Sequence, residues 1–365
     1  MTESEERKSR ARVFTRRENL MNNTWWRSVA TITLGLILAS LLLASLWYLR
    51  RPLALLVLGI AIAAALAPII SRVENRLPRA VVAILLYLFG VLVLIGMGWI
   101  IIPPLVMQAQ EIVAQAPNLL EQLEEMFGGL ERLAGIDLVD LILPELGRIG
   151  GMLLVLPLGV LSSLVEILVV MFISLYLLIE APNMEKFFLS LFPENRRGRI
   201  SNILQNMAQA MGGYIRGVAI GATVIGVFMY LGLLVIGVEF PLVLGLLAGL
   251  FEVIPYLGPI LAAIPIVLIA LLESTAQALI VVVFIVILQQ VESYVLVPNI
   301  MRTQTKVSPL LVLLAIIAGS SLAGLLGVLI AIPLVAALRV FVKEVVAPFV
   351  RERTGASPRG EEDLE

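Results

Sequence analysis

Two polar stretches interrupt the apolar last third of this chain. Glu252 lies in FEVIPYLGPILAAIP, residues 251–265, one helical turn before Pro255. Gln289 and Glu292 are three residues apart in the next apolar run, so on a helix they share one face. An acid at bilayer depth costs about 2.5–3.5 kcal/mol on insertion scales unless it is paired or hydrated. We therefore expect these side chains to coordinate a cation, carry a proton or bind a hydroxylated solute, with hydrogen bonding between helices as the structural alternative.

The backbone beside Glu252 is predicted to unwind. The segment IPYLGP, residues 254–259, contains Tyr256, two prolines that each remove a backbone donor, and a glycine that permits positive φ. As one helix, the 32 residues from 241 to 272 would cover about 48 Å, which exceeds a bilayer core of about 30 Å. A kink that only shapes the bundle is the alternative. Counting the later runs, breaks are expected at Pro255, Gly258, Pro259, Pro298, Gly319, Gly324, Gly327 and Pro333.

Three further polar residues fall in or beside apolar runs. Asn299 lies near the face that Gln289 and Glu292 share, and Glu166 lies near the middle of an earlier run. Arg216 opens an apolar run at its basic end and is expected to anchor that run at the membrane interface. The residues expected to line a solute or ion path are therefore Glu252, Tyr256, Gln289, Glu292, Asn299 and Glu166.

The composition indicates an integral membrane protein. Of the 365 residues, 60% are hydrophobic and only 15% are charged, whereas soluble domains are about half apolar. The chain has no cysteine and no histidine, which excludes disulfides, thiolate metal sites and histidine-based metalloenzymes. No glycine-rich phosphate loop is present, and a net charge of −1 does not favour nucleic acid. We expect no enzymatic activity, no metal site and no cofactor.

The apolar runs predict an all-α polytopic fold of about eight transmembrane helices with broken or re-entrant segments. A tight turn at 50–52 (RRP) should separate the first two spans. The alternative topology counts 240–272 and 309–341 as re-entrant hairpins instead of single spans. In order, the expected parts are a charged segment 1–27, three spans within 28–106, an acid-rich amphipathic helical region 107–151, five spans within 152–341 around a basic amphipathic segment 181–216, and a tail 342–365.

The basic residues predict the orientation in the membrane. The N-terminal segment, loop 72–79, segment 181–216 and the tail are rich in Lys and Arg, and eight crossings place all of them on one side. The positive-inside rule then makes both termini cytoplasmic and the 107–151 region extracytoplasmic. In this topology Arg50, Arg51, Arg302 and Lys306 fall on the wrong side.

The order of motifs in the last third resembles the autoinducer-2 exporter family of bacterial membrane transporters. The motifs are IPYLGP at 254–259, QQVESYVLVPNIM at 289–301 and the glycine-rich run 307–336 that ends in IPLVA. The resemblance is specific between about 240 and 340. The chain departs from the family pattern at Gly319-Ser320, at Arg302-Thr303 and at Ala262.

The resemblance implies a plasma-membrane exporter of a small hydrophilic solute, similar to autoinducer-2. Some family members exchange sodium for protons, so these ions are implied partners together with the lipid bilayer. A homo-oligomer, with a pentamer as the expected form, is also implied. Two other functions remain open from the residues: an uncoupled oligomeric channel or facilitator, and a membrane scaffold that acts through residues 107–151.

Overall fold

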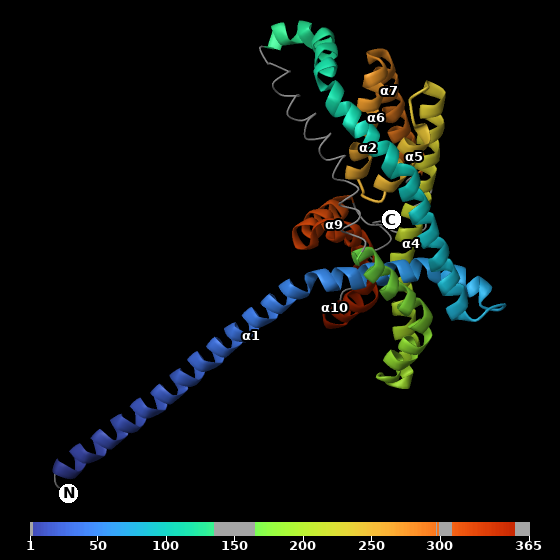
Figure 1. Cartoon of the computed structure of the whole chain (residues 1–365). Helices are drawn as coiled ribbons and strands as arrows, with labels where there is room; N and C mark the ends of the chain where they lie inside the picture. The colour runs from blue at the N-terminus through green and yellow to red at the C-terminus, as the bar shows by residue number, and fades with distance from the viewer. Residues whose placement is uncertain (1–2, 135–164, 297, 299–308, 355–365) are drawn as a thin grey trace. The chain divides into compact units, whose positions relative to one another are not determined.

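The computed structural model describes residues 3–134, 165–296, 298 and 309–354 (Figure 1). Within these ranges the chain forms helices joined by short turns, and no strand occurs. Six of the described helices are long and apolar enough to cross a membrane, and three shorter helices are also apolar. The predicted all-α polytopic membrane fold is therefore confirmed. Asn299 and the end of the predicted acid-rich region, 135–151, lie outside the described residues.

The helices follow one another with few residues between them. They are α1 (Glu3–Val73), α2 (Arg79–Ala134), the helix Val165–Ser190, α4 (Glu194–Ile236), α5 (Pro241–Phe251), α6 (Leu257–Glu273), α7 (Thr275–Val291), the π-helix η1 (Glu292–Leu296), α9 (Pro309–Phe341), the π-helix η2 (Val342–Val346) and α10 (Ala347–Thr354).

The predicted tight turn at 50–52 is wrong, because α1 continues through it. The Arg50 guanidinium lies 3.8 Å from the centroid of the Trp47 ring, one turn earlier on the same helix. This cation–π contact favours the helical turn, and Pro52 removes one hydrogen bond without having to end the helix. The chain divides into two compact units, residues 1–53 and 54–365. The functional residues lie in the second unit.

In the second unit, α4 is the helix around which the others gather. It packs along α5 and α9, while α6 packs against both α5 and α7. One buried cluster joins four of them through Leu233 of α4, Leu244 of α5, Ile266 of α6 and Val281 of α7. These four side chains are fully buried, so apolar packing fixes the helices that carry the candidate site.

The run 240–272 folds back on itself as a helical hairpin. The backbone N–H of Glu239, just before α5, donates to Glu273 Oε1 at the end of α6, at 2.9 Å. A straight helix would hold residues 34 apart at a distance of about 51 Å. At the tip, a Cβ on Gly258 would overlap the carbonyl oxygen of Phe251, so only glycine fits there. The hairpin alternative is therefore the one that the structure adopts for this run.

The run 309–341 forms a second hairpin within α9. Its backbone leaves the helical region at Ala323 (φ −137°, ψ 19°) and Gly324 (φ 61°, ψ −137°). The latter conformation is one that glycine tolerates. Gly319 and Gly327 lie against each other's backbone carbonyls across the break. In a straight helix they would be about 12 Å apart. The chain therefore reverses at 323–324.

Several predicted breaks fall at different places in the structure. The first break covers 252–256, two residues before the predicted segment, and Pro259 lies in the first turn of α6, where a missing N–H is tolerated. The prediction of a break at Pro333 is wrong: α9 stays helical through this residue, which is fully buried. Gly319 and Gly327 are helical and flank the reversal at Gly324, so they act as contacts between the two arms.

The hairpin at 240–272 predicts the side of the membrane on which Ser274 lies. The chain has no cysteine, so Ser274→Cys introduces a single thiol. A membrane-impermeant maleimide should label this thiol from the side opposite to a Gly198→Cys thiol in the basic segment. The reason is that α4 crosses once between residues 198 and 239 and the hairpin then returns to the side of residue 239. Labelling of both thiols from one side would mean that 240–272 spans the membrane.

Candidate functional site

The two acids predicted from the sequence meet in the structure. Glu252 is the C-terminal cap of α5, and Glu292 lies where α7 gives way to the π-helix η1. Their carboxyl groups are within hydrogen-bonding reach of each other. The Gln289 side-chain amide donates to Glu292 Oε2 at 2.9 Å. Three candidate path residues that come from two apolar runs therefore form one polar cluster. We call Glu252 and Glu292 the acid pair.

Irregular backbone on both elements positions the acid pair. Helix α5 ends at Phe251, the N–H of its cap Glu252 still donates to Ala248 O at 3.0 Å, and α6 begins only after Tyr256. Tyr256 has φ 65° and ψ −39°, a conformation that is rare for a residue with a side chain. Such outliers cluster at functional sites, as do single turns of π-helix like the one that begins at Glu292. The two irregular segments thus face the same point.

Tyr214 on α4 is the residue of this site that the sequence analysis missed. Its side chain is 5% exposed and packs among Ile316, Val328 and other residues from both arms of the α9 hairpin, with Ile254 of the first break against the same cluster. It also lies within electrostatic range of Glu252 and Tyr256. Tyr214 therefore stands between the two hairpins. The sequence pattern placed it at the end of a surface helix, whereas α4 continues unbroken from the surface into the core.

The chemistry available at this cluster is exchange of small charged or hydrogen-bonding groups. Two carboxyl groups this close can share one proton, since two adjacent negative charges repel each other. When the proton leaves, the same oxygens can accept a cation or the hydroxyl groups of a solute. Gln289 fixes the orientation of Glu292 through its amide donor. Within the described residues, no group of three or more acids could form a larger metal site.

Glu166 stays apart from the acid pair. It lies half-buried in the first turn of the helix Val165–Ser190. Among the residues that the structure describes, none forms a hydrogen bond or an ion pair with its carboxylate. Its predicted place on the solute path stays a prediction, and the exchange proposed below uses the acid pair and not Glu166. Glu166 also provides a control for experiments on the acid pair, because it too is an acid within an apolar helix.

Arg216 has a packing contact where an interfacial anchor was predicted. Its Nη1 donates to the backbone carbonyls of Ala64 at 3.2 Å and Ala65 at 3.1 Å, both on α1. The Ala64 carbonyl needs this donor because its helical partner would be Pro68, which has no N–H. Gly212 allows the approach, since a Cβ there would overlap the same carbonyl. Arg216 thus joins α1 to the part of α4 that carries Tyr214.

Replacing Arg216 by methionine should therefore lower the free energy of unfolding by about 1–3 kcal/mol, the cost of leaving a half-buried carbonyl without a donor. In a Pro68→Ala background the loss should be smaller, because the alanine N–H restores the helical hydrogen bond to Ala64. Unfolding of the four proteins in detergent gives the coupling free energy of this double-mutant cycle. Equal losses in both backgrounds would contradict the pairing of Arg216 with the proline gap.

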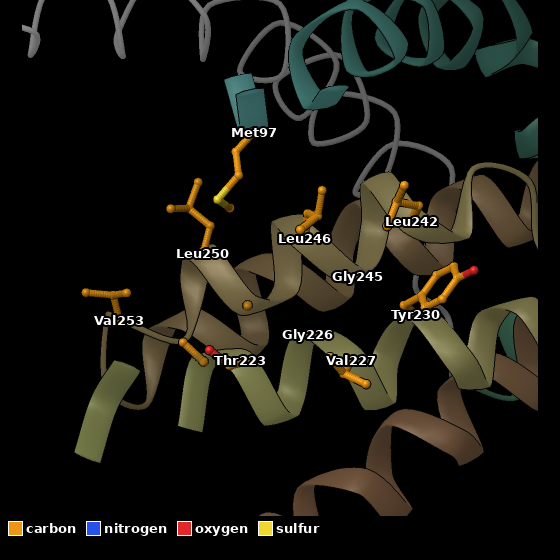
Figure 2. A pocket seen from close by; sticks show the side chains of 12 residues that line it. Met97, Thr223, Gly226, Val227, Tyr230, Leu242, Gly245, Leu246, Leu250 and Val253 are labelled. Carbon is orange, nitrogen blue, oxygen red and sulfur yellow. The ribbon is translucent and has the colours of Figure 1, made fainter. Parts of the chain in front are cut away.

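A separate cavity of about 360 Å³ lies between α4 and α5, with Met97 of α2 over it (Figure 2). Its walls are almost entirely apolar, and no carboxylate, amide or cationic side chain lines it. It does not suit a hydrophilic solute, since polar groups would lose their hydrogen bonds there. The polar cluster at Glu252 and the apolar cavity are therefore two different sites.

Comparison with known proteins agrees with a transport role. A family model described as "AI-2E family transporter" matches residues 36–347.

Three curated proteins, each named "Putative transport protein", are similar to the chain. YrrI of Bacillus subtilis is 36% identical over 183 residues, which cover 50% of this chain and 51% of that protein. YueF of the same organism is 24% identical over 296 residues, 76% and 80% of the two chains. MT0215 of Mycobacterium tuberculosis is 27% identical over 321 residues, 82% and 86% of the two chains. The match thus spans about half the length of YrrI and at least four fifths of the other two.

Proposed function

Since this chain belongs to the AI-2E family of membrane transporters, we propose that it exports a small hydrophilic solute and exchanges sodium ions for protons at the acid pair. The observation that carries the proposal is the meeting of Glu252 and Glu292, with Gln289 beside them, at two breaks in apolar helices. Broken helices of this kind commonly hold the ion and solute sites of secondary transporters.

Competition between protons and sodium ions for the same carboxylate oxygens would couple the proton flux to the sodium flux. With one shared proton the acid pair carries a single negative charge, and without it the pair carries two. A sodium ion would be attracted most to the fully ionised pair. Proton and sodium would therefore replace one another at this point. Tyr214 and Tyr256 add hydroxyl groups nearby that could recognise a hydroxylated solute such as autoinducer-2.

The hairpins also support a single cytoplasmic side for the basic segment 181–216 and the C-terminal tail, while the bacterial plasma membrane and a cytoplasmic N-terminus stay part of the proposal. If 240–272 does not cross, the connection after α7 returns to the side of the basic segment 181–216. Arg302 and Lys306 then join the cytoplasmic basic residues and cease to be exceptions to the positive-inside rule. At the same end, Asn206 of α4 donates to Glu344 Oε1 at 2.8 Å, which holds the start of α4 and the tail together. A homo-oligomer, with five subunits, remains part of the proposal.

Purified protein in liposomes that contain a trapped pH-sensitive dye tests the exchange. An imposed sodium gradient should move protons in the opposite direction, at a rate that scales with the amount of protein. An uncoupled facilitator would pass solute without any response of the dye. A scaffold acting through 107–151 would give no flux at all, and deletion of that region alone would remove its function.

A further inference from the structure

The apolar cavity between α4 and α5 has a floor of backbone. The two helices approach closely at Gly226, Gly245 and Gly249, and a Cβ on Gly245 would lie 2.8 Å from the Gly226 carbonyl oxygen. Figure 2 shows Leu246 and Leu250 of α5 rising beside this floor, with the Met97 side chain above them. The result is a groove with an almost entirely apolar lining, in contrast to the acid pair.

The groove is open along its length and has the dimension of one lipid leaflet. Val227, Leu242, Leu250 and Val253 are each between 38% and 49% exposed, so the walls face outward as well as inward. From Leu242 to Phe251, the last residue of α5, nine residues of helical rise correspond to about 14 Å. One leaflet of a hydrocarbon core of about 30 Å is about 15 Å deep. An extended acyl chain therefore fits the groove from end to end.

The outer end of the groove is acidic. Glu239 lies three residues before Leu242, and its N–H donates to Glu273 Oε1 at 2.9 Å, which brings the two exposed acids together. A lipid whose tail lies along α5 would place its headgroup at this end. A primary ammonium would be attracted to the two carboxylates, whereas a headgroup with only a phosphate charge would be repelled.

We propose that this groove binds one acyl chain of a membrane phospholipid and that it prefers a headgroup with a primary ammonium, such as phosphatidylethanolamine. The lipid belongs to the leaflet on the side of residue 239, opposite the basic segment. Its tail ends against Val253, the neighbour of Glu252, so an occupied groove holds the C-terminal end of α5 in place. This lipid site does not depend on the transport mechanism proposed above.

Delipidated protein titrated with phosphatidylethanolamine or phosphatidylglycerol, with lipid adducts counted by native mass spectrometry, tests the site. Phosphatidylethanolamine should bind more tightly by a factor of about 1.5 to 5, the range of one exposed ion pair. Val227→Trp should fill the groove and weaken binding about tenfold or more, as expected for loss of several buried methylene groups. Val235→Trp is the matched control, because this residue is on the same helix and is 86% exposed. Thr223→Phe is a second blocking variant if Val227→Trp does not fold.

The preference for an ammonium headgroup is tested by a separate double variant. Glu239→Gln with Glu273→Gln removes both charges and keeps an oxygen acceptor at position 273, so lipid should still bind but without preference for the ammonium headgroup. Equal lipid binding by wild type, Val227→Trp and Thr223→Phe would overturn the site. Disulfide formation between two copies of a Val227→Cys variant would also overturn it, since a second copy of the chain would then cover the groove.

Discussion

Glutamine in place of either Glu252 or Glu292 is expected to reduce sodium-driven proton flux in liposomes to the level of liposomes without protein. Glutamine has the size of a protonated glutamate and still forms a hydrogen bond with the remaining acid, so the fold should persist. It cannot release a proton, however, and a single carboxylate has no partner with which to share one. We expect the free energy of unfolding to change by less than about 1 kcal/mol, since one hydrogen bond is exchanged for another.

The matched control for these variants is Glu166→Gln. It also neutralises an acid within an apolar helix, but Glu166 has no described contact with the acid pair. This variant should retain proton flux close to that of the wild type. Full activity of both Glu252→Gln and Glu292→Gln would remove the acid pair from the mechanism. Equal loss in all three variants would point to a general effect of charge in the membrane region.

Alanine at Gly327 is expected to disrupt the second hairpin. The added Cβ would overlap the carbonyl of Gly319, and because this neighbour is backbone, it cannot move aside without opening the hairpin. The cost should be at least about 1–3 kcal/mol, the range for overpacking a tight core. Gly319→Ala should have a similar effect, because its Cβ would meet the carbonyl of Gly327 in the same way.

The control for the glycine contact is Gly221→Ala on α4. No heavy atom lies within 4 Å of a Cβ at this position, so alanine should be neutral or should stabilise the helix by up to about 1 kcal/mol. The thermal unfolding midpoint in detergent checks all three variants. If Gly327→Ala melted at the same temperature as Gly221→Ala, the arms of the hairpin would not be in close contact.

The sequence predicts each of the two acids as a functional residue, because an ionisable side chain in an apolar run is costly and seldom present without a role. Glu252, Gln289 and Glu292 could be named from their positions alone, although their contact could not. Tyr214 escaped notice because the sequence places it at the end of a basic amphipathic segment, just before an apolar run, and only its packing against α9 gives it a role. Burial of this kind depends on residues about a hundred positions apart in the chain.

The fold class followed from composition, but the hairpins did not. A long apolar run with a break is compatible with a kinked helix that crosses the membrane once and with a hairpin that reverses. The length of the run does not distinguish these two folds. The choice depends on contacts such as Gly319 with Gly327 and Glu239 with Glu273. The predicted breaks were an uneven guide, since Pro333 is accommodated within a helix while Gly324, also predicted, makes the second turn.

The most direct test of coupled transport is accumulation of solute against its own gradient. Proteoliposomes of the wild-type protein would be given an imposed pH gradient and a panel of small labelled hydroxylated solutes, with autoinducer-2 among them. We predict that at least one solute becomes concentrated on one side, and that a protonophore abolishes this accumulation. Flux of every transported solute that stops at equal concentrations, with or without the pH gradient, would contradict the proposed coupling.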